Sequence, residues 1–221
     1  MSALGENEWG ARLPAALAYL VTALGVALLA ARLGAARPEL AALVWGTMLL
    51  PFVGGNLAST DILLTAFETL AVLGFATLEF APAARTAGLW TMWLGFGLAF
   101  ATKGPPGLLP LLGILAYGVA THGARGAWRL FAWAPVLAFL VLAAGWFAWI
   151  VARDPRLLDY FLVYETLDRV ATDVHHRNPG WLGLVKAYGS TIAAGTLPWL
   201  PLGLWAAWRA RRGTGAPRGV P

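Results

Sequence analysis

The chain has 221 residues, of which 59% are hydrophobic and only 12% are charged, with a formal net charge of +5 at pH 7 and no cysteine. A mean hydropathy of +0.66 is too high for a soluble domain whose surface must meet water, and the lack of cysteine excludes disulfides and thiolate metal sites. The basic pI of about 10.1 predicts no nucleic-acid partner, because the excess cations fall in short loops and in the carboxyl-terminal tail.

Several stretches with almost no charge are each long enough to cross a bilayer. A helix rises about 1.5 Å per residue, so about 20 residues span a hydrocarbon core of about 30 Å. Backbone groups in lipid must satisfy one another, and these stretches lack the alternation of barrel strands. The sequence therefore predicts an all-α integral membrane protein, a bundle of about seven transmembrane helices. The predicted spans are 13–31, 40–60, 62–78, 86–102, 104–121, 130–152 and 187–208.

The polar segments define the domain organisation and the orientation. Residues 1–152 hold the first six predicted helices, and 153–186 form one sizeable outer loop that we expect to contain short helices. Residues 187–208 form the seventh helix, and 209–221 form a basic tail. Cations concentrate in this tail and in the loops on one side, so the positive-inside rule predicts an amino terminus outside and a cytoplasmic carboxyl terminus.

The amino-terminal end carries the carboxylates Glu6 and Glu8 and no basic segment, so it is unlike a signal peptide. An acidic start outside the membrane normally follows a hydrophobic segment. We therefore expect the natural protein to begin upstream of this chain.

Asp61 begins the third predicted helix. Its simplest role is helix capping, because Ser59, Thr60 and an aspartate suit the free amides and the dipole at the start of a helix. Thr65 and Glu68 share a helical face with Asp61, and a role in orienting an acceptor or a catalytic group is the alternative. We interpret Glu68 as a packing residue, neutral or paired, without an assigned role.

Lys103 stands between two uncharged stretches, at the predicted outer end of the fourth helix. Gly104, Pro105 and Pro106 follow it and prevent the helix from continuing directly into the next one. The simplest interpretation is a lysine that extends to the membrane surface and anchors a helix end. However, a charge at this depth is costly and usually functional, and a compact ammonium can stabilise phosphate charge.

The predicted outer loop is the richest polar segment. Glu165 and Arg169 are four residues apart, so on a helix they can form a solvated pair; alternatively, Arg169 can reach phosphate oxygens through its planar guanidinium. His175 and His176 are adjacent, and neighbouring histidines usually point apart, so their spacing gives little support for a metal site. A solvated loop histidine is the alternative to a metal ligand.

Five groups of residues, in order along the chain, resemble the signatures of bacterial polyprenyl-phosphate-sugar glycosyltransferases. This GT-C fold family includes the aminoarabinose lipid A transferase and related protein mannosyltransferases. Each group is weak alone, but their order and spacing cover nearly the whole chain. They are NEWGARLPAAL at 7–17, STDILLT at 59–65, TKGPPG at 102–107, the YE, R and HHRNP positions within 164–179, and LPW at 197–199.

The resemblance implies roles for individual residues. It implies that Asp61 is a catalytic residue, and that Lys103 and Arg169 bind the phosphate of the lipid carrier. Glu165 and Arg177 are implied as supporting residues. In this family, the positive side chains would stabilise the lipid phosphate as it departs from the sugar.

The resemblance also implies a metal and a missing segment. His176 is aligned with a histidine that can bind a divalent metal, zinc or magnesium, together with an acidic ligand of the first outer loop. Family members begin with a further helix and that outer loop, which carries a catalytic aspartate. We therefore expect this chain to be a fragment that is inactive in isolation.

The implied function is sugar transfer at the outer face of the bacterial inner membrane. The donor is a polyprenyl-phosphate sugar, the acceptor is lipid A, a protein or a glycan, and membrane lipids surround the protein. A transporter or flippase for a lipid-linked or anionic substrate is the alternative, and it would show paired helix interruptions from internal repeats. The sequence shows one clear interruption, after Lys103, which favours the enzyme. A non-catalytic truncated paralogue is the third possibility.

Overall fold

The computed structural model describes residues 8–57, 59–156 and 180–213, and these residues form helices and short connections without any strand. The predicted all-α class is therefore confirmed. In chain order the elements are α1 (Glu8–Arg32), α2 (Pro38–Thr47), α3 (Leu49–Asn56), α4 (Asp61–Phe80), η1 (Pro82–Ala84), α5 (Arg85–Lys103), η2 (Pro105–Leu108), α6 (Leu109–Trp128), α7 (Trp133–Arg153), α10 (Gly180–Gly195) and α11 (Trp199–Gly213).

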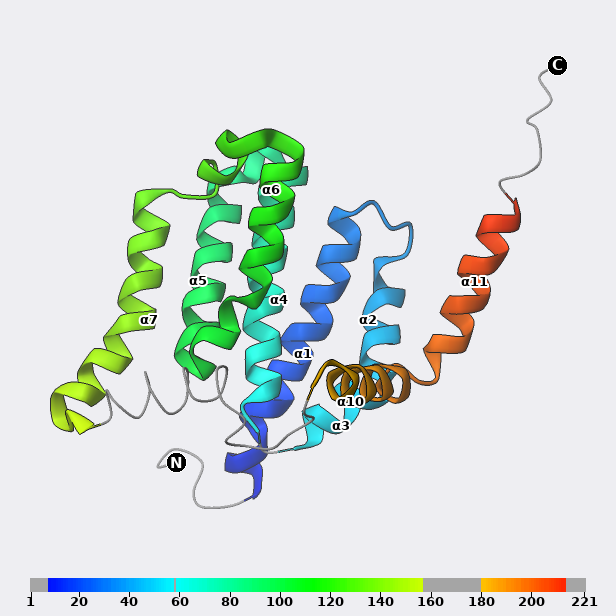
Figure 1. Ribbon diagram of the computed structural model, residues 1–221, viewed down its shortest axis with the longest axis horizontal. Helices are drawn as coiled ribbons and strands as arrows, with labels where there is room; N and C mark the ends of the chain where they lie inside the picture. Colours follow the sequence, from blue (N-terminus) through cyan, green and yellow to red (C-terminus); the bar gives the residue numbers. More distant parts are fainter. Residues whose placement is uncertain (1–7, 58, 157–179, 214–221) are drawn as a thin grey trace.

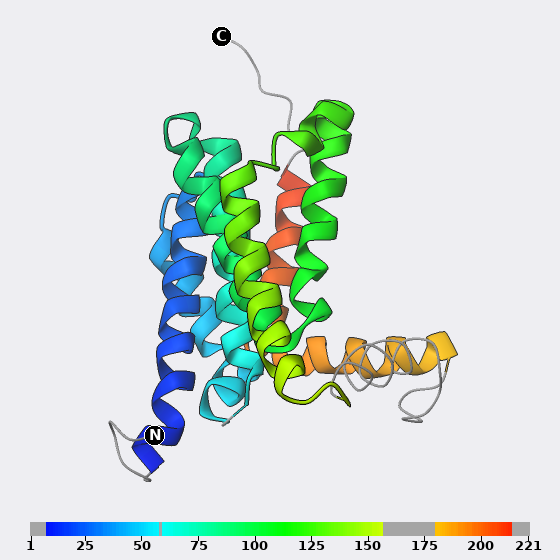
Figure 2. The same cartoon turned by 90° about the vertical axis from the view of Figure 1, so that its left-hand side faces the viewer.

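The long helices α1, α4, α5, α6 and α7 run side by side; α1, α4 and α6 run in one direction, and α5 and α7 in the other (Figure 1). Figure 2 shows the same bundle from its side, with α10 lying across the helix axes at one end. We call this the Lys103 end, since α1 and α4 begin there and α5 finishes there. The opposite end, where α5 begins and α6 turns back, is named the His122 end. These reversals of direction place residues that are far apart in sequence at the same end.

The described helices match the predicted spans in part. Four of them, α1, α4, η2 with α6, and α7, are long and apolar enough to cross a membrane, and the bent pair α2 and α3 makes a fifth if it is one span. Helices α5 and α11 are not among them. Gly, Thr and Trp lower the mean hydropathy of α5, and α11 is too short, with 15 residues. The chain is a membrane protein, and the number of seven crossings stays a prediction.

The stretch 187–208, which we predicted as one helix, is divided between α10 and α11. Its lack of charge fits a membrane span, but Pro198 has no N–H group to continue a helical hydrogen-bond ladder. The break contacts a second one, between α2 and α3, which bends by 67°. The Leu49 N–H donates to the Leu197 carbonyl at 3.0 Å, and Trp199 Nε1 donates to Thr47 Oγ1 at 2.7 Å.

Helices α4 and α5 make the closest contact of the bundle because glycines line it. A Cβ placed on Gly95 would lie 2.7 Å from the Ala71 nitrogen, and one on Gly88 would lie 2.7 Å from the Leu78 nitrogen. Small residues let two helix backbones approach in this way, which is a common source of helix association in membranes. These contacts fix the position of α5 along α4, and therefore the position of Lys103.

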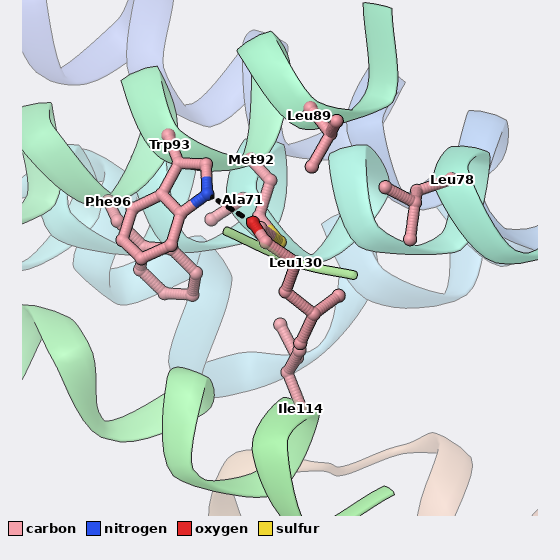
Figure 3. Packing of buried hydrophobic residues seen from close by; sticks show 8 residues of the cluster. All are labelled: Ala71, Leu78, Leu89, Met92, Trp93, Phe96, Ile114 and Leu130. Carbon is pink, nitrogen blue, oxygen red and sulfur yellow. Dashed lines mark hydrogen bonds between the residues drawn. The ribbon is translucent and has the colours of Figure 1, made fainter. Parts of the chain in front are cut away.

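The main apolar core lies beside this contact and collects residues of α4, α5 and α6 around the α6–α7 connection (Figure 3). Trp93 donates from Nε1 to the Leu130 carbonyl at 2.7 Å, which satisfies both buried groups. Met92, Phe96 and Leu130 are almost fully buried here. The core therefore fastens the connection after α6 onto α5 at the His122 end.

Candidate functional site

The end of α5 is shaped by the sequence Lys103-Gly104-Pro105-Pro106-Gly107. Gly104 has φ +72°, a conformation that favours glycine, and its N–H donates to the Phe100 carbonyl at 2.6 Å. The short helix η2 then turns back, and a Cβ on Gly107 would lie 2.6 Å from the Ala99 carbonyl carbon. The helix thus stops directly after Lys103, and its ammonium is carried at the end of α5.

Lys103 and Asp61 come together at this end. The Lys103 ammonium donates to the Asp61 carboxylate and forms an ion pair with it, across 42 residues of sequence. The Lys103 side chain is 41% exposed and that of Asp61 is 65% exposed, so the pair is open to an incoming molecule. Of the site residues predicted from sequence, these two are the ones that the structure brings together.

The start of α4 supports this pair. Asp61 is the first residue of α4, where a carboxylate is favoured by the helix dipole, and its N–H donates to Ser59 Oγ at 3.3 Å. Thr65 Oγ1 donates to the Asp61 carbonyl at 2.9 Å. Asp61 therefore starts α4, as predicted, and also contacts Lys103.

The arrangement offers a cation with free hydrogen-bond donors at the end of the bundle. A lysine ammonium has three N–H donors, and the Asp61 carboxylate uses only part of them. Glu68, about two turns further along α4, is half-buried. An anion can therefore approach Lys103 from the exposed side while the Asp61 carboxylate holds the ammonium from α4.

The other predicted site residues, Glu165, Arg169, His176 and Arg177, lie outside the described residues. In the ranges 8–57, 59–156 and 180–213 there is no group of three or more His, Asp or Glu side chains able to hold a metal ion. The metal prediction stays a prediction, since His176 was its one named ligand.

A second pair, at the His122 end, was not predicted. His122 Nε2 lies 2.6 Å from Glu79 Oε1, and the two side chains are 34% and 12% exposed. Gly123 follows with φ +68° and turns the chain back over the bundle. The two residues are 43 positions apart in sequence, so no spacing rule relates them. The one available signal was that both fall at helix ends on the same predicted side.

Comparison with known proteins gives a consistent set of relatives. Residues 1–149 match the dolichyl-phosphate-mannose-protein mannosyltransferase family. The undecaprenyl phosphate-alpha-4-amino-4-deoxy-L-arabinose arabinosyl transferase of Edwardsiella ictaluri is 32% identical over 219 residues, which cover 94% of this chain. The second such transferase of Sodalis glossinidius is 32% identical over an alignment of 222 positions, which covers 95% of the chain. That of Erwinia tasmaniensis is 28% identical over 216 residues, or 94%.

The matched regions are only part of these relatives. The chain spans 38%, 39% and 38% of the lengths of the three transferases, in the same order. No solved structure matches the chain.

Proposed function

The chain belongs to the dolichyl-phosphate-mannose-protein mannosyltransferase family, and from this membership we propose that it serves a membrane glycosyltransferase reaction. The reaction is the transfer of a sugar from a polyprenyl-phosphate carrier to a lipid A, protein or glycan acceptor. It takes place at the outer face of the bacterial inner membrane, with the amino terminus of the chain outside. Relatives named as undecaprenyl-phosphate aminoarabinose transferases, with matches covering nearly all of this chain, support the choice of donor.

The observation that carries the proposal is the open Lys103–Asp61 pair at the end of the bundle. In the reaction, an acceptor oxygen attacks the anomeric carbon, and the bond from this carbon to the phosphate oxygen breaks. The electron pair of the broken bond stays on the lipid phosphate, whose negative charge increases. A positioned ammonium stabilises this charge in the transition state, which is the role that we give to Lys103.

Asp61 acts in this proposal as a positioning residue. It holds the ammonium at the Lys103 end of the bundle before the donor binds. A carboxylate next to a bound phosphate also repels it. Replacing Asp61 by asparagine is therefore expected to keep or improve carrier binding but to slow transfer, since the ammonium loses its fixed position.

The remaining roles rest on the family resemblance. We propose that Arg169 contributes a second cation to the carrier phosphate, with Glu165 and Arg177 in support. His176 is proposed as a ligand of a divalent metal in the longer protein. No step of the reaction described here depends on that metal, and the base that accepts the acceptor proton is an acidic residue that the resemblance puts in an upstream loop.

Carrier binding tests the proposal on this chain itself. The purified chain is titrated with undecaprenyl phosphate in detergent, and native mass spectrometry measures the fraction of the protein that carries the lipid. Lys103→Ala is expected to weaken binding at least tenfold, because one charge-assisted contact to phosphate contributes about 1.5–3 kcal/mol. Lys186→Ala removes an exposed lysine of α10 at the same end and is expected to bind as the wild type does. Equal binding by the Lys103 and Lys186 variants would show that Lys103 does not bind the carrier phosphate.

A transporter or flippase remains the second candidate because the structure contains two helix interruptions in contact, between α2 and α3 and between α10 and α11. Discontinuous helices often form substrate sites in transporters. Proteoliposomes holding the longer protein and a labelled lipid-linked sugar separate the two activities. A transferase yields glycosylated acceptor, whereas a flippase moves the intact donor between leaflets without consuming it.

A further inference from the structure

Three arginines lie together at the His122 end, away from the site described above. Arg85, the first residue of α5, donates from Nη2 to the Arg129 carbonyl at 3.1 Å. Arg125 and Arg129 are one helical turn apart, and the Arg129 N–H donates to the Arg125 carbonyl at 3.2 Å. The segment that carries them folds back over the bundle after Gly123 (Figure 1). Two distant parts of the chain therefore bring three guanidiniums to one surface.

Among the described residues, no carboxylate forms an ion pair with this arginine group. In the part of the chain that the structure describes, Arg85, Arg125 and Arg129 form no ion pair, and Glu79, the carboxylate at the end of α4, is held by His122. Arg125 and Arg129 are exposed. The group thus retains three positive charges and most of its N–H donors, in the planar arrangement that matches phosphate oxygens.

The position of the group suits a lipid headgroup. Trp128 and Trp133 flank the turn between α6 and α7 and are strongly exposed, as is typical of tryptophans at the level of lipid headgroups. Helix α5 begins and helix α6 ends next to these tryptophans, so the three arginines lie where the apolar helices end. Basic pockets between transmembrane helices at this depth bind anionic headgroups.

We propose that Arg85, Arg125 and Arg129 form a binding site for the phosphodiester headgroup of an anionic phospholipid, at the end of the bundle opposite Lys103. The site is independent of sugar transfer and of the carrier. Its ligand fixes the turn after α6, and with it the depth of this end of the bundle in the membrane.

Native mass spectrometry with palmitoyl-oleoyl phosphatidylglycerol tests the site on the intact chain. We expect binding in preference to palmitoyl-oleoyl phosphatidylcholine and no competition by inorganic phosphate at the same concentration. Arg125→Gln is expected to weaken binding about fivefold and the Arg125→Gln, Arg129→Gln double variant about thirtyfold, since each basic side chain near an anionic surface contributes about 1 kcal/mol. Arg32→Gln, which removes an exposed arginine of α1 at the same end, is expected to change little.

The outcomes decide the proposal in each case. Equal binding of the two lipids, or equal losses in the Arg32 and Arg125 variants, would mean a diffuse surface charge and overturn the site. Displacement by inorganic phosphate would assign it to a free anion instead. If the double variant does not fold, the comparison of Arg125→Gln with Arg125→Lys decides, because the Arg125 side chain makes no described contact that folding requires. Undecaprenyl phosphate binding to Lys103 is unaffected in every arginine variant.

Discussion

The two ends of α4 carry the same local arrangement with different exposure. At one end a lysine precedes Gly104, a glycine with positive φ, and contacts Asp61; at the other a histidine precedes Gly123, also with positive φ, and contacts Glu79. The first acidic side chain is 65% exposed and the second 12%. An open pair can exchange one partner for a ligand, whereas a covered pair holds two helices together. Exposure therefore separates a binding role from a structural one.

Removal of the lysine is expected to have the largest effect. In the proposed reaction, Lys103→Ala should lower the rate of sugar transfer about 10²–10³-fold, as does the loss of one preorganised donor in other enzymes. Radiolabelled product formation from polyprenyl-phosphate sugar measures it. His122→Ala, which removes one member of the pair at the opposite end, serves as the control. Its rate of sugar transfer should stay within about twofold of wild type. A similar fall in both variants would contradict the division of roles.

Disruption of the α4–α5 contact should affect both pairs together through the fold. Gly95→Leu places a side chain where the Ala71 backbone lies, and the free energy of unfolding should fall by about 3 kcal/mol or the helices should separate. Thermal unfolding in detergent provides the measurement. Gly113→Leu serves as the control, since a Cβ there meets no atom within 4 Å.

Loss of the covered pair should lower stability to an intermediate degree. Glu79→Gln is expected to reduce the free energy of unfolding by about 1–2 kcal/mol, because a charge-assisted hydrogen bond with limited solvent exposure is weakened. Thermal unfolding reports the change, and titration with undecaprenyl phosphate should give the wild-type affinity. A loss of carrier binding without a loss of stability would reverse the interpretation.

The smallest stability change is expected for the open pair. Asp61→Asn should alter the free energy of unfolding by less than about 1 kcal/mol, as is usual for exposed ion pairs. The same thermal measurement applies, and Glu79→Gln provides the matched comparison. A destabilisation larger than that of Glu79→Gln would make Asp61 a structural residue first.

The sequence predicted the helical class, and it singled out Asp61 and Lys103 as site residues, but it did not predict that the two form an ion pair. Long uncharged stretches specify helices in lipid, and a short connection between α4 and α5 returns Lys103 to the end at which Asp61 starts. The arginines of the loops were assigned to orientation alone. Their convergence depends on the reversal at Gly123 and on the Trp93–Leu130 hydrogen bond, which no local pattern indicates.

The break between α10 and α11 was not predicted from the sequence, for a different reason. Absence of charge is the main signal for a membrane span, and 187–208 satisfies it throughout. Where the helix stops depends on Pro198 together with a distant partner, since the α2–α3 bend supplies the hydrogen-bonding groups that meet Leu197 and Trp199. Tertiary contacts of this kind are outside the reach of a hydropathy pattern.

The glycine contact between α4 and α5 also affects how this protein can move. The backbones of α4 and α5 touch, so no layer of side chains lies between them to rearrange. The two helices should therefore move together as one rigid unit. Any widening that admits the proposed isoprenoid donor must then come from the elements packed around α4 and α5. A crosslink between α4 and α5 should leave turnover intact, whereas one that ties α10 to α3 should arrest it.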